Sequence, residues 1–133
     1  MVKGKAQWTS SPWGFRYYDL SAYCDYMLSQ QIDRICILLG SETGLPLAIA
    51  ADREQAQKAV TVCRDKGIGI AEAAALNGDH AENLEICGVL GCAYYRICNI
   101  FDDTAKVRTE LIKDLQTIGD IAVDYGITVI LEN

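Results

Sequence analysis

Apolar and polar residues alternate along the chain with two different periods. Five short runs rich in apolar and β-branched residues predict strands. These runs are Ala6 to Thr9, Asp33 to Leu39, Ile68 to Ala74, Ala93 to Asn99 and Ile127 to Glu132. Between them, apolar residues recur every three or four positions, which is typical of amphipathic helices. Regular alternation of strand and helix predicts an α/β protein with a parallel sheet.

The ends of the four predicted helices are marked by their capping residues. An aspartate precedes each of the first three, where its carboxylate can accept free backbone N–H groups of the first turn. These are Asp19, Asp52 and Asp79. A glycine ends each of the last three, where a left-handed residue is favoured. These are Gly67, Gly91 and Gly126.

The connections differ in length on the two sides of the predicted sheet. Gly67 and Gly126 lead almost directly into strands, whereas the segments after strands are longer, especially Gly40 to Ala51 and Ala75 to Asp79. In parallel α/β folds the long connections at the carboxyl ends of the strands carry the functional residues. We therefore expect the functional site at that end.

Two architectures fit this order of elements. A doubly wound, flavodoxin-type sheet would need a helix after the strand Ile127 to Glu132, and no residues remain to form one. It would also usually carry a phosphate loop or acidic cluster after its first strand, and Trp8 to Phe15 has neither. A complete (β/α)8 barrel needs ~250 residues. We therefore favour a TIM-barrel half, with four βα units and a fifth strand, in which residues 1–133 form a single domain.

Composition and charge narrow the class of function. The net charge is −6, with 50% hydrophobic and 23% charged residues, which fits a globular protein and argues against a nucleic-acid partner. Apolar runs such as Gly44 to Ala51 are too short to cross a bilayer. The basic start, Met1 to Lys5, lacks the apolar stretch of a signal peptide. We expect a cytoplasmic protein that handles small molecules and does not bind membranes.

Cysteine and histidine offer little metal chemistry in this sequence. None of the six cysteines forms a C-x-x-C pair, so we expect reduced thiols, most of them in the core. They are Cys24, Cys36, Cys63, Cys87, Cys92 and Cys98. His80 is the single histidine and lies beside the predicted N-cap Asp79, so we expect a surface or capping role.

Several motifs resemble the sugar phosphate isomerase/epimerase family of xylose isomerase-like TIM barrels. Leu90-Gly91-Cys92, then Arg96 on the fourth strand, then Leu131-Glu132-Asn133 match the N-terminal half of that family in order and spacing. The resemblance implies a divalent metal (Mn²⁺, Mg²⁺ or Co²⁺) with Glu132 as its first ligand and a catalytic carboxylate. It implies interconversion of aldose and ketose, or epimerisation of a keto sugar.

The resemblance implies that the remaining ligands and the second catalytic glutamate lie on later strands, which this chain does not have. We therefore expect the chain to be catalytically incomplete alone and completed by self-association as a homodimer, which would also cover open sheet edges. The alternative is a non-catalytic half-barrel with a structural, oligomerising role.

Four residues are the candidates for a substrate site. Glu132 ends an apolar strand. It is either a functional carboxylate or a solvated charge. Arg96 lies in a strand that should be buried, so it needs a partner, either Glu72 on the preceding strand or a substrate anion. Trp13 and Phe15 follow the first strand and could form an apolar wall for a sugar, or fold over the barrel mouth as packing residues.

Overall fold

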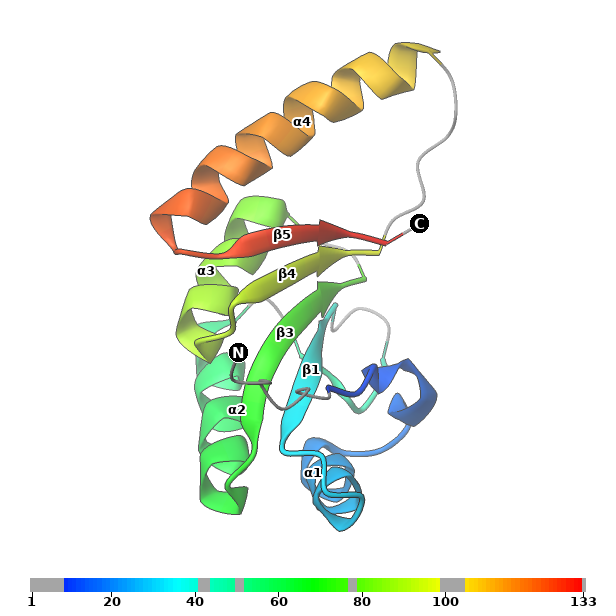
Figure 1. The fold of residues 1–133 in the computed structure, drawn as a ribbon, viewed down its shortest axis with the longest axis vertical. Helices are drawn as coiled ribbons and strands as arrows, with labels where there is room; N and C mark the ends of the chain where they lie inside the picture. Colours follow the sequence, from blue (N-terminus) through cyan, green and yellow to red (C-terminus); the bar gives the residue numbers. More distant parts are fainter. Residues whose placement is uncertain (1–8, 41–43, 50–51, 77–78, 99–104, 133) are drawn as a thin grey trace, which may run out of the picture.

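The computed structural model describes residues 9–40, 44–49, 52–76, 79–98 and 105–132, with backbone only for 105–107. Its elements are η1 (Pro12–Phe15), α1 (Leu20–Ser29), β1 (Arg34–Leu39), β2 (Ala48–Ile49), α2 (Arg53–Lys66), β3 (Gly69–Ala75), α3 (His80–Leu90), β4 (Tyr94–Ile97), α4 (Ala105–Asp124) and β5 (Thr128–Leu131) (Figure 1). The last four predicted strands and all four helices are confirmed. The first predicted strand lies outside the described residues, apart from Thr9.

The strands form one parallel sheet in the order β2-β1-β3-β4-β5 (Figure 1). Two segments share the edge of β1 that faces away from β3. Ser10 forms a parallel bridge with Ile35 near the start of β1, and β2 pairs with Leu38 and Leu39 at its end. The two-residue strand β2 was predicted as part of a connection, because so short a pairing leaves no periodic signal.

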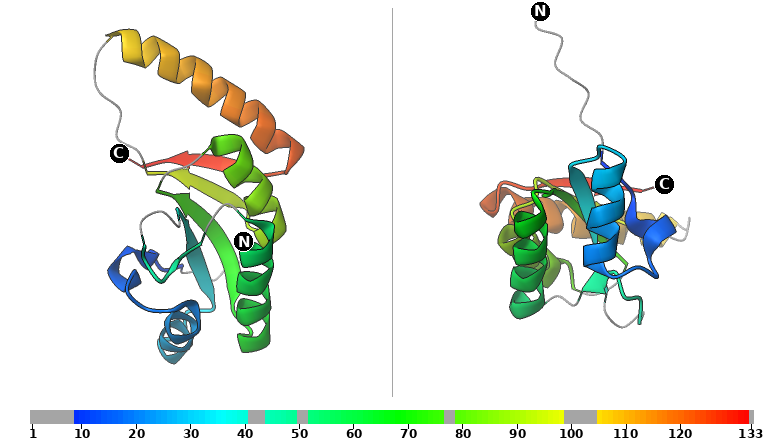
Figure 2. Two further views of the ribbon diagram at one scale, coloured as in Figure 1. Left: turned by 180° about the vertical axis from the view of Figure 1, so that it is seen from behind. Right: turned by 90° about the horizontal axis from the view of Figure 1, so that it is seen from below.

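Helices α1 to α4 pack on one face of this sheet, called the outer face. Ile37, Ala73 and Tyr95 from three neighbouring strands share a buried cluster with side chains from all four helices. Alternate residues point to the opposite, inner face, where Cys36, Leu38 and Ala74 form a separate small cluster that includes no helical residue among those described. Figure 2 shows the helices and the sheet from behind and from below. This one-sided arrangement excludes the doubly wound alternative.

The predicted helix caps are confirmed. Each aspartate side chain accepts backbone N–H groups in the first turn: Asp19 from Ala22, Asp52 from Glu54 and Gln55, and Asp79 from Ala81 and Glu82. Such a cap contributes about 1 kcal/mol. The glycines Gly67, Gly91 and Gly126 adopt φ values of 72°, 69° and 65°, a left-handed conformation that side chains disfavour.

Helix α4 is the longest helix and carries two apolar faces. Ile118 and Ala122 are buried against the sheet, whereas Ile112 and Val123 are exposed.

Neither α4 nor any other helix of the described residues has the length and hydropathy needed to span a bilayer.

The six cysteines are free thiols, and five of them are buried. Cys24 on α1 and Cys63 on α2 lie with their sulfur atoms 4.0 Å apart. Small apolar side chains of this kind let the two helices pack closely.

Candidate functional site

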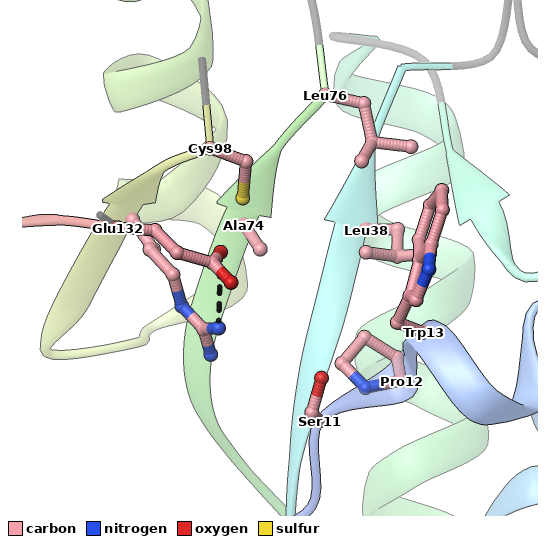
Figure 3. Close-up of a pocket in the computed structure, with 9 residues that line it drawn as sticks. Ser11, Pro12, Trp13, Leu38, Ala74, Leu76, Cys98 and Glu132 are labelled. Atoms are coloured by element: carbon pink, nitrogen blue, oxygen red, sulfur yellow. Dashed lines mark hydrogen bonds and ion pairs between the residues drawn. The ribbon is translucent and has the colours of Figure 1, made fainter. Parts of the chain in front are cut away.

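A hollow of about 350 Å³ opens on the inner face at the carboxyl ends of the strands (Figure 3). Its size is within the range of small-molecule sites. The lining residues are Ser11, Pro12, Trp13, Leu38, Ala74, Leu76, Arg96, Cys98 and Glu132. The hollow therefore lies at the end of the sheet where the loop lengths predict a functional site.

Arg96 on β4 and Glu132, which directly follows β5, form the polar side of the hollow, and the buried Glu72 on β3 lies behind Arg96. Arg96 pairs with Glu72 through Nε and Nη2, and its Nη1 lies 3.5 Å from Glu132 Oε2. Glu72 is only 7% exposed, and a buried carboxylate is stabilised by a cationic partner. The predicted pairing of Arg96 with Glu72 is confirmed.

The charge of Glu72 affects the pKa values of both Arg96 and Cys36. Burial lowers the pKa of Arg96, but the attraction and hydrogen bond of Glu72 outweigh it, and the net pKa is raised. The thiol of Cys36 lies 3.7 Å from Glu72 Oε1. Burial, and then the charge of Glu72, raise the pKa of Cys36, so it remains a protonated thiol. Arg96 is thus a fixed cation between two carboxylates.

Cys98 also lines the hollow, although the sequence predicts only that it is a reduced thiol. It lies at the end of β4 and lines the hollow near Glu132. Burial, followed by a hydrogen bond to Glu132 and the charge of that residue, raises the pKa of Cys98 to about 11. Arg96 and Cys98 are two positions apart in the sequence, and residues two apart in a strand share a face. That spacing could have placed the thiol in the site.

The opposite side of the hollow is apolar and is built largely by η1 and β1. Figure 3 shows Trp13 across the hollow from Glu132, with Pro12 and Leu38 beside it. The Trp13 ring is held from outside the hollow by Arg16, whose guanidinium carbon lies 5.1 Å from the ring centroid. Arg16 Nη1 also donates to the Trp13 carbonyl oxygen at 2.8 Å.

Phe15 does not line this hollow. Its ring centroid lies 5.2 Å from those of both Tyr23 and Tyr26, and it packs against the core of the outer face. Residues two apart in a 3₁₀ helix point in different directions, because each residue turns by a third of a circle. The structure therefore brings Trp13, Arg96 and Glu132 together and places Phe15 elsewhere.

His80 is the first residue of α3 and faces the outer side of the sheet. Its Nδ1 lies 2.7 Å from the hydroxyl oxygen of Tyr95, to which Asn83 Nδ2 also donates at 3.2 Å. Burial raises the pKa of Tyr95, so its hydroxyl keeps its proton and can donate to Nδ1. His80 therefore supports the packing of α3 on β4, a long-range contact that the sequence did not reveal.

The described residues do not form a metal centre by themselves. They contain no group of three His, Cys, Asp or Glu side chains placed to hold one ion. Glu72 is paired with Arg96, which leaves Glu132 as the one carboxylate lining the hollow in the part of the chain that the structure describes. A hard divalent cation takes six or more oxygen ligands. The carboxylate of Glu132 could supply only part of such a shell.

Comparisons with known proteins define the fold. No protein-family model and no curated protein matches the sequence. Among solved structures, the chain is similar to a xylose isomerase domain protein from Planctomyces limnophilus, with a TM-score of 0.62 and 14% identity. It is also similar to an IOLI protein with a bound zinc atom, with a TM-score of 0.64 and 17% identity. A beta-arabinopyranosidase gives a TM-score of 0.61 at 16% identity.

The extent of these matches fits half of a barrel. They cover 79%, 88% and 99% of this chain, but 45%, 47% and 23% of the three structures. The chain thus spans about half the length of the first two. It has the α/β fold of half a xylose isomerase-like TIM barrel, as the sequence predicted.

Proposed function

We propose that this chain is half of a divalent-metal-dependent sugar or sugar phosphate isomerase or epimerase, catalytically incomplete alone and completed by self-association. One observation carries the proposal: Arg96 and Glu132 face a hollow at the carboxyl ends of the strands, on the face that the helices leave free. Active sites of TIM barrels lie at this end.

Three of the lining residues, Glu132, Arg96 and Trp13, have distinct roles in the proposal. Glu132 accepts hydrogen bonds from substrate hydroxyl groups and is a ligand of the metal, while Arg96 orients Glu132 through its Nη1. Trp13 covers the apolar face of the sugar. Metal dependence is supported by the zinc atom in the IOLI structure and by the motif resemblance. A bound Mn²⁺, Mg²⁺ or Co²⁺ would polarise substrate oxygens, and its other ligands would come from outside the described residues.

The partner in this proposal is a second copy of the chain. Tyr94 and Ile130 are 44% and 37% exposed and lie in β4 and β5 at register positions of the inner face. An edge strand with exposed apolar residues favours association in water. We place the protein in the cytoplasm, in keeping with its acidic composition and free thiols.

Two experiments test the proposal. Size-exclusion chromatography with light scattering should give a dimer, and a monodisperse monomer would contradict self-association. Isomerisation and epimerisation assays with Mn²⁺ should show activity that Glu132→Gln reduces by at least about 100-fold. Glu85→Gln, on the exposed side of α3, is the matched control and should keep full activity.

A second function follows if the assays fail. A stable dimer without activity, whose Mn²⁺ affinity is unchanged by Glu132→Gln, would indicate a non-catalytic half-barrel with a structural role. The exposed apolar residues Tyr94 and Ile130, which favour association and need no chemistry, support that candidate.

A further inference from the structure

The charges around the hollow sum to a negative value. Glu72 and Glu132 contribute two negative charges and Arg96 one positive charge. Among the described residues that line the hollow, Arg96 is the only cation. An anionic ligand therefore meets net repulsion there unless it displaces one of the carboxylates.

Displacement is opposed by the way in which Arg96 is held. Its Nε and Nη2 both face Glu72, and only Nη1 points toward Glu132. Taking Arg96 away from Glu72 would leave a carboxylate that is 7% exposed without its cation. An unpaired buried charge is strongly unfavourable. A phosphate group would thus have at most Nη1 available, in direct competition with Glu132.

Two of the segments that follow the strands contain no cationic residue in the sequence. The sequence contains no Lys or Arg from Gly40 to Asp52 or from Cys98 to Ala105, whereas it has Glu42, Asp102 and Asp103. Arg16, which follows the first predicted strand, has its guanidinium stacked on Trp13 and Tyr17.

An uncharged polyhydroxy compound meets complementary groups instead. Glu132 accepts hydrogen bonds from hydroxyl groups, the hydroxyl of Ser11 can donate, and Trp13 offers an apolar surface to C–H groups. We infer that this hollow selects a neutral sugar or polyol and discriminates against its phosphate ester. The inference rests on the proposed sugar-binding function and narrows its substrate class.

The test compares one neutral sugar with its ester on the full chain. Binding of fructose and of its terminal phosphate ester is measured by calorimetry in the presence of EDTA, so that no metal can attract the phosphate. We expect fructose to bind at least about tenfold more tightly than the ester. Equal or tighter binding of the ester, or no binding of either compound, would overturn the inference.

A charge-removing variant tests the cause. Glu132→Gln keeps the shape of the side chain but removes one negative charge, so the preference for the neutral sugar should shrink several-fold. Glu85→Gln removes one charge on the outer side and should leave the preference unchanged. An unchanged preference in Glu132→Gln would overturn the electrostatic explanation.

The two proposals fail separately. Selective binding of the neutral sugar without turnover would sink the isomerase function and leave this inference intact. Turnover of the phosphate ester in preference to the neutral sugar would do the opposite.

Discussion

Arg96 on β4 forms its ion pair with Glu72, which lies diagonally across from it on β3. In the register of the two strands, Arg96 is opposite Ala74, and Glu72 is two residues nearer the start of β3. Diagonal neighbours of this kind share a face and are within reach of a long side chain. The pair therefore joins β3 and β4 on the inner face and fixes the arginine that contacts Glu132.

Breaking this pair should destabilise the fold. Glu72→Gln leaves the Arg96 cation without its buried partner, and we expect the free energy of unfolding to fall by about 2 to 4 kcal/mol in urea titrations. Glu85→Gln interrupts only an exposed pair with Arg53 and should leave stability nearly unchanged.

A double variant measures how much of the stability comes from the interaction between Glu72 and Arg96. Glu72→Leu with Arg96→Leu removes both charges, so its cost should be smaller than the sum of the two single variants. Strictly additive costs would mean that the two side chains stabilise the sheet independently, against the contact in the structure.

Cys98 should be a slow nucleophile because burial, and then the hydrogen bond and charge of Glu132, raise its pKa. Its pKa is raised from 9.0 to about 11, so its thiolate fraction near neutral pH is on the order of 100-fold below that of an ordinary thiol. Alkylation by iodoacetamide, followed by mass spectrometry, should be slow in the folded protein and faster in Glu132→Gln. Cys98→Ser should abolish the labelling of the folded state, since the other five thiols are buried. Equal rates in the wild type and Glu132→Gln would show that Glu132 does not act on this thiol.

The residues of this site were predictable to different degrees. Arg96 and Glu72 could be paired from the sequence because a charge in a buried strand needs a partner on a neighbouring strand. Cys98 was missed because a free cysteine has the same pattern as a small apolar residue. Phe15 could not be placed, since the direction of its side chain depends on the 3₁₀ helix η1, which the sequence does not mark. The metal role of Glu132 stays a prediction.

The fold was more predictable than the site. Strand and helix periods and the capping residues Asp19, Asp52 and Asp79 are local signals, and the structure follows them closely. The contact between His80 and Tyr95 joins a helix to the strand after it, and β2 is two residues long. Neither feature has a local pattern from which it could be predicted.

Tyr23 should make the protein sensitive to alkali. It is fully buried, and its hydroxyl donates to the Ser10 carbonyl oxygen at 3.1 Å. Burial raises its pKa from 10.0 to about 12, although a hydrogen bond with the Ser10 side chain lowers it. The folded state thus holds the proton more tightly than the unfolded state. This contribution to stability is complete below pH 10.0 and is lost as the pH rises through about 12.

A matched substitution isolates this group. The urea midpoint of the wild type should fall between pH 10.0 and about 12, and Tyr23→Phe, which cannot ionise, should show a smaller fall over the same window. Tyr17→Phe, at a side chain that is 70% exposed, should behave as the wild type. The same alkaline loss in Tyr23→Phe would mean that other groups cause it.

Two helical glycines should respond in opposite ways to alanine. At Gly119 on α4 an added Cβ meets nothing within 4 Å, so Gly119→Ala should stabilise the protein by about 0.5 to 1 kcal/mol through helix propensity. At Gly88 on α3 the added Cβ would lie 3.0 Å from Tyr125 Cδ1, so the ring would have to move. Gly88→Ala should therefore gain less stability than Gly119→Ala, or lose some, in thermal unfolding. Gly88→Ala combined with Tyr125→Ala should recover the gain relative to Tyr125→Ala alone, because the obstacle is then removed. An equal gain in both single variants would show that Tyr125 does not restrict the packing of α3.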